Sequence, residues 1–219
     1  MEYAWILFGA GAYLMGAIPF GKGIARVVAR MDITQRGSGN IGATNVAREL
    51  GIKWGIVTLV LDILKGLAPL LVLMRWAPPP SDAAPQTALA LVGLCALLGH
   101  QFSIFMKFKG GKGVATALGV YLAISPTACL AALAVFLFTV AKWDYISLGS
   151  ILSSFTVPLV ILLMDKPSGV FTAALAMALL ITVQHRENIR RLIKGQERKW
   201  KKRSDQPSRS SSRSNSSSL

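Results

Sequence analysis

The sequence is poor in charge, above all in negative charge. Only 16% of its 219 residues are charged, and 24 Lys and Arg residues outnumber ten Asp and Glu residues. A soluble domain usually carries about a quarter charged residues, whereas the mean hydropathy of this chain is +0.50. Segments 3–21, 113–141 and 145–164 contain no Asp, Glu, Lys or Arg. An ordinary soluble enzyme is excluded, because such segments have the roughly 20 mainly apolar residues of a membrane-spanning helix.

Cysteine is also scarce, and no cluster of metal-ligating residues is apparent. The two cysteines, Cys95 and Cys129, lie in apolar surroundings and offer neither a disulfide framework nor metal-ligand spacing. The apolar segments are continuous rather than alternating, which argues against a transmembrane β-barrel. We therefore predict an all-α, polytopic integral membrane protein that holds no metal and no other cofactor.

The positive charge is concentrated in alternate loops. We predict seven transmembrane helices, over residues 3–21, 54–74, 86–106, 114–125, 126–141, 145–164 and 167–184. Twenty-one of the 24 Lys and Arg residues fall in one set of loops and in the C-terminal segment, whereas only Arg75 and Lys166 fall in the other set. This asymmetry is typical of the cytoplasmic side of a membrane protein. The net charge of +14 therefore needs no nucleic acid as partner.

The same asymmetry predicts the orientation. No basic residue precedes the first span, and three follow it within 22–30, so we expect an uncleaved first helix with its N-terminus outside and the C-terminus in the cytoplasm. Residues 113–141 decide the number of spans. Ser125 before Pro126 divides them, because the residue before a proline is disfavoured in the α conformation. Five spans remain the alternative.

We expect a single transmembrane domain over residues 1–203. Residues 204–219 are a low-complexity Ser/Arg tail. Such a composition cannot bury a hydrophobic core, so this tail is predicted to be disordered.

Three polar segments stand out against the apolar background, and this topology places all three on the cytoplasmic face. The first is 37–48, the second is 99–103 with 108–116, and the third is 185–192 with Gly195 and Glu197. Glycines let backbone N–H groups approach an anion, and a helix that begins nearby adds a positive dipole. Lys112 supplies a point charge and Arg48 a bidentate guanidinium that suits phosphate. We therefore predict a phosphate-binding surface; the alternative is that the cations only mark the interface while the glycines form turns.

Two stretches resemble nucleotide-binding motifs, but neither is predicted to bind a nucleotide. Residues 37–42 match G-x-G-x-x-G, yet no strand precedes Gly37. The second segment resembles a P-loop, but Gly113 replaces the Ser or Thr that would bind magnesium.

Ionisable residues also occur inside the predicted spans. Asp62 and Lys65 are three residues apart and share a helix face. Ionisable residues in a membrane are functional candidates, because unpaired charge there is costly. We favour a structural ion pair, whereas His100 is equally compatible with helix packing and with a ligand site.

The motifs SGNIGATNVAR, FKGGKGVAT and HRENIRRL, in this order between apolar helices, closely resemble those of the bacterial acyl-phosphate-dependent glycerol-3-phosphate acyltransferases. The resemblance covers residues 1–197. It implies a seven-helix enzyme of the cell inner membrane, with its active site at the cytoplasmic face. Such an enzyme transfers a fatty acyl group from acyl phosphate to position 1 of sn-glycerol 3-phosphate, giving lysophosphatidic acid and phosphate, the first step of bacterial phospholipid synthesis. The implied partners are these two substrates, the lipid bilayer and, functionally, an enzyme that forms acyl phosphate.

The resemblance also implies the site residues. The expected catalytic residues are Ser38, Arg48, Lys112, His185 and Asn188. The expected substrate- or phosphate-binding residues are Gly39, Asn40, Thr44, Asn45, Lys109, Gly110, Gly111 and Gly113. Glu197 is expected to be structural, as are Asp62 and Lys65. One departure is Gln184, where family members often have a basic residue before the histidine.

The role of His185 has two interpretations, a general base or a residue that positions the substrate. We favour positioning, because the surrounding cations would lower its basicity and a phosphate oxygen of the donor can accept the proton.

A transporter and a scaffold protein are the alternative classes of function. A transporter for a phosphorylated solute would have its site near the midplane with access from both sides, and a scaffold protein would leave the polar segments unexplained.

Overall fold

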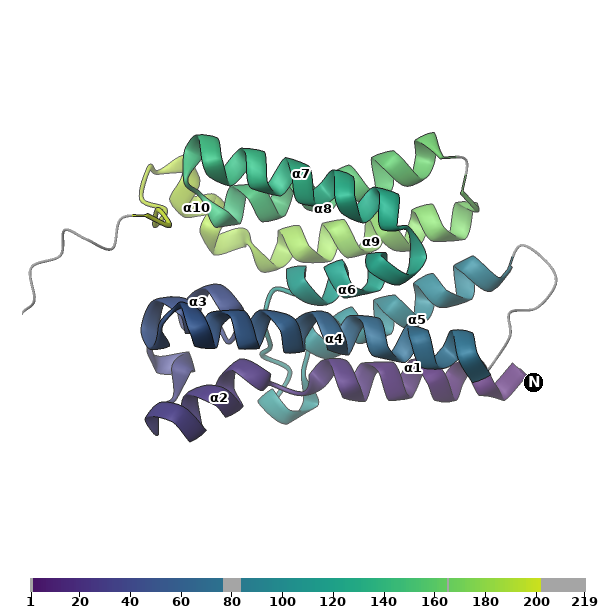
Figure 1. Ribbon diagram of the computed structural model, residues 1–219, viewed down its shortest axis with the longest axis horizontal. Helices are drawn as coiled ribbons and strands as arrows, with labels where there is room; N and C mark the ends of the chain where they lie inside the picture. Colours follow the sequence, from purple (N-terminus) through teal and green to yellow (C-terminus); the bar gives the residue numbers. More distant parts are fainter. Residues whose placement is uncertain (1, 77–83, 165, 202–219) are drawn as a thin grey trace, which may run out of the picture.

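The computed structural model (Figure 1) describes residues 2–76, 84–164 and 166–201, and these contain only helices and connecting segments, with no strand. The helices are α1 (Glu2–Ala17), α2 (Phe20–Ala29), η1 (Ile33–Gln35), α3 (Ala43–Leu50), α4 (Ile52–Trp76), α5 (Ala84–Gln101), η2 (Ile104–Met106), α6 (Val114–Ile124), α7 (Pro126–Trp143), α8 (Ile146–Leu163), α9 (Ser168–Gln184) and α10 (Arg186–Ile193). The all-α prediction is thereby confirmed for the described residues. The tail predicted to be disordered, 204–219, lies outside them.

Each predicted span contains a long or apolar helix, but two spans end earlier than expected. The first was expected over 3–21, yet α1 ends at Ala17. Pro19 breaks it, because proline lacks an N–H and disfavours the α conformation at the residue before it. The third was expected to reach residue 106, but α5 ends at Gln101 and a turn of 3-10 helix follows.

The division of residues 113–141 is as expected. Helix α6 ends at Ile124 and α7 begins at Pro126, a favourable first position for proline. The hydroxyl of Ser125 accepts a hydrogen bond from the N–H of Ala128 (3.4 Å) and so caps α7. A single helix across this stretch is therefore wrong, whereas the number of spans stays a prediction.

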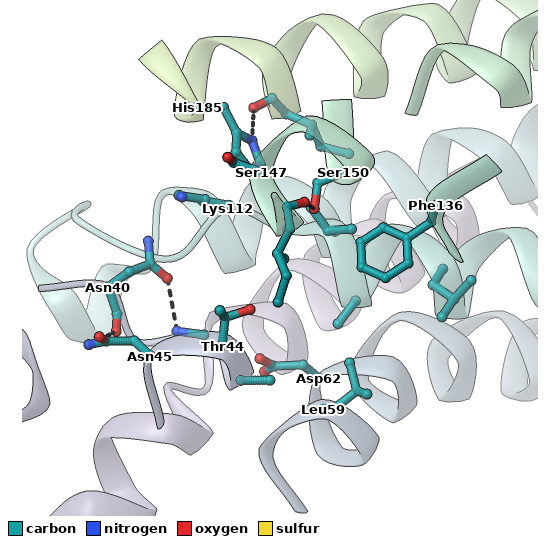
Figure 2. Close-up of a pocket in the computed structure, with 18 of the residues that line it drawn as sticks. Asn40, Thr44, Asn45, Leu59, Asp62, Lys112, Phe136, Ser147, Ser150 and His185 are labelled. Atoms are coloured by element: carbon teal, nitrogen blue, oxygen red, sulfur yellow. Dashed lines mark hydrogen bonds between the residues drawn. The ribbon is translucent and has the colours of Figure 1, made fainter. Parts of the chain in front are cut away.

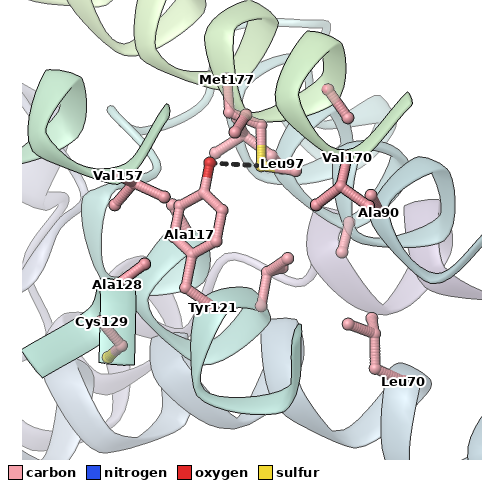
Figure 3. Close-up of a cluster of buried hydrophobic side chains, with 14 of the residues drawn as sticks. Leu70, Ala90, Leu97, Ala117, Tyr121, Ala128, Cys129, Val157, Val170 and Met177 are labelled. Atoms are coloured by element: carbon pink, nitrogen blue, oxygen red, sulfur yellow. Dashed lines mark hydrogen bonds between the residues drawn. The ribbon is translucent and has the colours of Figure 1, made fainter. Parts of the chain in front are cut away.

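Helix α6 is short and enclosed. It contacts α4, α5 and α7, and Figure 1 shows it between the group α1, α4, α5 and the group α7, α8, α9. Gly66 of α4 permits this close approach, because a Cβ there would collide with the carbonyl of Thr116. Figure 3 shows the core around α6, where the Tyr121 hydroxyl donates to Met177 Sδ (3.4 Å). Protein therefore surrounds much of the shortest apolar helix.

The outer surface of the long helices is apolar. Leu7, Leu137 and Leu163 are 73%, 57% and 77% exposed. Within the described residues, four segments are long and apolar enough to cross a membrane, and these are Ile52–Trp76, Gln86–Met106, Pro126–Trp143 and Ile146–Leu163. Helices α9 and α10, bent by 61°, pass the same test when they are taken together. So much exposed apolar surface is typical of contact with lipid.

The polar segments gather at one end of the bundle. In Figure 1, helices α2, α3 and α10 lie at the end opposite to the N-terminus. Helix α3 carries much of the first polar segment and α10 most of the third. The fold therefore brings together segments that are more than 130 residues apart in the chain.

Candidate active site

A cavity of about 570 Å³ joins the three polar segments. Of the site residues expected from the sequence, it is lined by Ser38, Asn40, Thr44, Asn45, Arg48, Lys112, Gly113, His185, Asn188 and Glu197, and also by Asp62. Figure 2 shows Asn40, Thr44, Lys112 and His185 around one part of this space. The residues expected in the site that do not line it are Gly39, Lys109, Gly110 and Gly111.

Asn45 organises the first segment. Its Oδ1 accepts from the N–H of Ser38 (2.9 Å), and its Nδ2 donates to the carbonyls of Asn40 (2.9 Å) and Arg36 (3.1 Å). A Cβ at Gly37 would collide with this amide, and φ there is +59°. Because the described backbone occupies the Asn45 amide, its contacts are those of a residue that shapes the loop rather than of a ligand to substrate.

The glycines of the second segment serve close packing, which differs from the expectation. The N–H groups of Gly110 and Gly111 donate to the carbonyls of Gln101 and His100, both at 3.0 Å. A Cβ at either glycine would collide with the end of α5. In the first segment, the N–H of Gly39 is likewise donated to Arg36 (2.8 Å). These three N–H groups are thus engaged by the protein, although they were expected to bind phosphate.

Two helices begin at the cavity. The first turns of α3 and α6 line it, through Gly42, Ala43 and Thr44 and through Gly113, Val114 and Ala115. Gly113 caps α6 with φ +86°, a conformation that suits glycine. Because a helix N-terminus carries a partial positive charge and unpaired N–H groups, both ends favour an anion in the cavity.

A chain of hydrogen bonds links the second and third segments. Lys112 Nζ donates to Asn188 Oδ1 (2.5 Å), and Asn188 Nδ2 donates to Glu197 Oε1 (2.6 Å). Glu197 also accepts from Ser147 (2.8 Å) and from Arg191 Nε (2.8 Å). Burial, opposed by Glu197 and aided by the positive charges of Arg191 and Arg48, lowers the pKa of Lys112 to about 8.

His185 is buried at the cavity wall, with 2% of its surface exposed. Its Nδ1 is 2.8 Å from the carbonyl of Ile181, so the neutral ring donates through Nδ1 and keeps Nε2 as an acceptor. Burial, and then the charge of Lys112, lower the pKa of His185 to about 4. The imidazole is therefore neutral at physiological pH.

Arg48 comes from α3 and also lines the cavity. Its Nη2 donates to the carbonyl of Arg198 (3.3 Å), and its guanidinium lies 5.9 Å from the ring centroid of Trp200. Burial and the charge of Arg198 lower the pKa of Arg48, but a guanidinium stays protonated in proteins. The polar end of the cavity thus carries Arg48, Lys112, Arg191 and Arg198 beside a single carboxylate of the third segment.

The rest of the cavity is apolar and lies between α4, α6, α7 and α8. Its lining includes Ile56, Leu59, Leu118, Leu133, Phe136 and Val157. Figure 2 shows Phe136 on the side away from Lys112 and Asn40. Ser150 and Ser154 lie here too, but their hydroxyls donate to carbonyls of their own helix. A ligand that fits this cavity therefore combines an anionic group with an apolar chain.

The intramembrane ion pair lies beside the cavity. Lys65 Nζ is 3.0 Å from Asp62 Oδ1 and donates to the carbonyl of Ile18 (3.0 Å). His100 Nδ1 lies 3.9 Å from the same carboxylate oxygen, and both Asp62 and His100 line the cavity. The two charges are paired as the sequence predicts, while the structural role assigned to the pair stays a prediction.

Several residues of the site were missed by sequence reasoning, among them Gln101, Ser147, Arg191, Arg198 and Trp200. The side chain of Gln101 holds the carbonyl of Lys112 (2.9 Å), and it had no signal beyond its place at the end of a span. Arg191 lies inside the third motif, so its charge was a usable signal. Within 2–76, 84–164 and 166–201, no group of three or more His, Cys, Asp or Glu residues is placed to hold a metal ion.

The fold and the cavity define an integral membrane protein that combines a cationic anion site with an apolar groove. The family model described as glycerol-3-phosphate acyltransferase matches residues 6–195. The chain therefore belongs to the glycerol-3-phosphate acyltransferase family, and it is an integral membrane acyltransferase of phospholipid biosynthesis.

Individual relatives agree with the family assignment. The chain is 48% identical to the glycerol-3-phosphate acyltransferase of Geotalea daltonii over 192 residues, 88% of this chain and 95% of the relative. The corresponding protein of Trichlorobacter lovleyi is 49% identical over 197 residues, 90% and 96% of the two chains. The structure also matches crystal structures of PlsY, an integral membrane glycerol 3-phosphate acyltransferase. The glycerol 3-phosphate form has TM-score 0.83 and 40% identity, and the lysophosphatidic acid form has TM-score 0.80 and 39% identity; each match covers 90% of this chain and 95% of that one.

Proposed function

We propose that this protein transfers a fatty acyl group from acyl phosphate to the 1-hydroxyl of sn-glycerol 3-phosphate. The products are 1-acyl-sn-glycerol 3-phosphate and inorganic phosphate. The observation that carries the proposal is a cavity with four cations at one end and an apolar groove at the other. The solved relative with glycerol 3-phosphate and with lysophosphatidic acid supports the acceptor and the product. The acyl phosphate donor rests on the resemblance of the motifs.

The chemistry needs little from the protein beyond positioning and charge. Acyl phosphate is a mixed anhydride, already activated toward a hydroxyl group. The 1-hydroxyl oxygen of glycerol 3-phosphate attacks the acyl carbon, the bond from that carbon to the phosphate oxygen breaks, and the departing phosphate takes the hydroxyl proton. Arg48, Lys112 and the first turns of α3 and α6 hold the two phosphate groups, with Ser38 and Thr44 as hydroxyl donors. Preorganised positive charge of this kind stabilises the developing negative charge.

In this proposal His185 positions the acceptor. Nε2 is free to accept a hydrogen bond from the attacking hydroxyl, because Nδ1 is occupied by Ile181. With a pKa lowered to about 4, the imidazole is a weak base compared with a phosphate dianion. Asn188 and Glu197 orient Lys112 through their hydrogen bonds rather than by contact with the reacting atoms.

The decisive assay uses purified protein with palmitoyl phosphate. Phosphate release that depends on glycerol 3-phosphate, with equimolar lysophosphatidic acid, is the expected result. Palmitoyl-CoA in place of palmitoyl phosphate, with the thiol as the measured product, tests the donor separately. Release of phosphate without the acceptor, or transfer from the thioester alone, would refute the proposed donor.

We further propose seven spans in the cell inner membrane, with the N-terminus outside and the cavity open to the cytoplasm. Helix α6 has 11 residues, about 17 Å at 1.5 Å per residue, and crosses only because α4, α5 and α7 enclose it. Lys109→Cys and Lys194→Cys, in a chain without Cys95 and Cys129, should be labelled by a membrane-impermeant maleimide only after the cells are permeabilised. Both positions are exposed, unlike Gly113, where a side chain would collide with Leu97. Labelling of either in intact cells would contradict this orientation.

A further inference from the structure

The segment after α10 lines part of the cavity. We name residues 197–201 the C-terminal strap; they lie beyond residues 6–195, which the family model matches. The N–H of Trp200 donates to the carbonyl of Asp144 (2.9 Å), and the N–H of Lys201 donates to the Asp144 carboxylate (3.1 Å). Glu197 accepts from Ser147 at the start of α8 (2.8 Å). The strap is therefore tied to the α7–α8 connection at both of its ends.

From this position the strap contacts Arg48 of α3. The carbonyl of Arg198 accepts from Arg48 Nη2 (3.3 Å), and the Trp200 ring lies 5.9 Å from the guanidinium carbon. Among the residues that the structure describes, Arg48 donates no other side-chain hydrogen bond, so four of its five N–H groups face no protein acceptor. Both Arg198 and Trp200 line the cavity. The strap thus contacts one edge and one face of the guanidinium, and the other N–H groups stay available to a ligand.

The charges around Arg48 explain why such support is needed. Arg198 and Arg191 are the cations that most affect it, opposed by Glu197 and Asp144. Like charges would drive a long, flexible side chain toward solvent, whereas the negative face of an indole attracts a guanidinium. A phosphate then meets a guanidinium that is already oriented.

We propose that Trp200 is a positioning residue that orients Arg48 toward the phosphate group of a phosphorylated substrate. The inference rests on the proposed function, in which Arg48 binds a phosphate. That phosphate belongs either to glycerol 3-phosphate or to the acyl donor, and the shared chemistry is a phosphate oxyanion that accepts from a guanidinium. The effect of losing the indole is therefore a weaker apparent affinity for one phosphorylated substrate, with little change at the reacting carbon.

The kinetic test compares Trp200→Ala with Trp200→Phe and Lys201→Ala. Lys201 is the matched control, because only its backbone N–H takes part in the strap and its side chain is exposed. We expect Trp200→Ala to raise KM for one of the two substrates about threefold to tenfold, the range of an exposed to half-buried cation–π contact, with kcat within twofold. Trp200→Phe keeps an aromatic face and should recover most of the loss. Separate titrations of the two substrates identify which phosphate is held.

A double substitution tests whether the effect passes through Arg48. In an Arg48→Lys background, adding Trp200→Ala should change KM less than twofold, because the planar guanidinium that the indole orients is already gone. Full additivity of the two effects would overturn the proposal. Unchanged KM for both substrates in Trp200→Ala, or equal losses in Trp200→Phe and Trp200→Ala, would also overturn it.

A binding measurement separates this inference from the proposed function. Inorganic phosphate, added to the detergent-purified protein, should cause a saturable change in tryptophan fluorescence that Trp200→Phe removes and Arg48→Ala weakens. The other four tryptophans remain as an internal reference. Absence of acyl transfer in the wild type with an intact Trp200 signal would refute the proposed function alone. A phosphate response that survives in Trp200→Phe would refute the positioning role alone.

Discussion

Two lysines of this protein, the buried Lys65 and the half-buried Lys112, are each joined to a carboxylate, but in different ways. Lys65 meets Asp62 directly at 3.0 Å, and both residues belong to α4. Lys112 reaches Glu197 only through the amide of Asn188, which lies 76 residues further along the chain. A direct pair neutralises its lysine, whereas an intervening amide orients the lysine and leaves its charge for an anion. The comparison predicts a structural role for Lys65 and an anion-binding role for Lys112.

The largest expected effect is on stability, from breaking the direct pair. Asp62→Ala leaves Lys65 as an uncompensated buried charge, and removing one partner of such a pair costs about 3–5 kcal/mol. Thermal unfolding in detergent should show a greatly lowered Tm. The double variant Asp62→Leu with Lys65→Met removes both charges and should recover much of the loss. A Tm of Asp62→Ala equal to that of the wild type would mean that the pair does not stabilise the fold.

Disrupting the hydrogen-bonded chain of Lys112, Asn188 and Glu197 should instead lower activity. Lys112→Ala removes a charge-assisted contact to phosphate, which corresponds to about 1.5–3 kcal/mol of transition-state binding, or about tenfold to 150-fold in kcat/KM. Its Tm should stay near that of the wild type. Lys109→Ala is the matched control, because Lys109 is an exposed lysine of the same segment that does not line the cavity. Equal activity losses in the two variants would leave Lys112 as a marker of the interface only.

The pH dependence sharpens the same contrast. If the ammonium form of Lys112 binds phosphate, as we propose, its pKa of about 8 predicts that kcat/KM is highest below pH 8 and falls above it. The fall approaches about tenfold per pH unit as the ammonium form is lost. Lys112→Arg should retain activity above this pH, since a guanidinium does not deprotonate there. A fall at the same pH in Lys112→Arg would assign this titration to another group.

The pH profile of His185→Asn tests whether His185 is the general base. If His185 were the base, kcat should rise with pH through a pKa near 4, the lowered value of its imidazole, and His185→Asn should remove that limb. We expect His185→Asn to lose about threefold to tenfold in rate, the range of one neutral hydrogen bond, and to keep the shape of the profile. Rates at saturating concentrations of both substrates decide between the two. Loss of the limb would make His185 the base.

The smallest expected effect is that of Glu197→Gln. The glutamine still accepts from Asn188 or Ser147 but loses the ion pair with Arg191, so we expect about a twofold to fivefold lower kcat/KM. Hydrogen bonds from Asn188, Arg191 and Ser147 hold the pKa of Glu197 below its ordinary value despite its burial. The stabilisation they provide is therefore present above the ordinary pKa and is lost as the pH falls through the lowered one. Acid unfolding of wild type and Glu197→Gln measures it, and coincident curves would contradict this account.

Sequence reasoning succeeded where the deciding interactions are local. The break at Ser125 and Pro126 depends on adjacent residues, and the pairing of Asp62 with Lys65 depends on one turn of helix. It was wrong about the first span, because the effect of Pro19 on the helix before it was not taken into account. It also expected the N–H groups of Gly110 and Gly111 to be available, and their acceptors lie on α5, nine and eleven residues earlier in the chain.

The amino-acid sequence by itself therefore determined that this chain is a helical membrane protein with three cationic, glycine-rich segments, and to which family their motifs belong. These properties follow from composition, apolar run length and short motifs, all of which are local. Only the tertiary structure decided which polar groups face the cavity and which are already occupied by the protein. The Lys112–Asn188–Glu197 chain and the contact of Arg48 with Trp200 join residues 76 and more than 150 positions apart. No periodicity predicts such partners, because hydrogen-bond geometry at that range depends on how the helices pack.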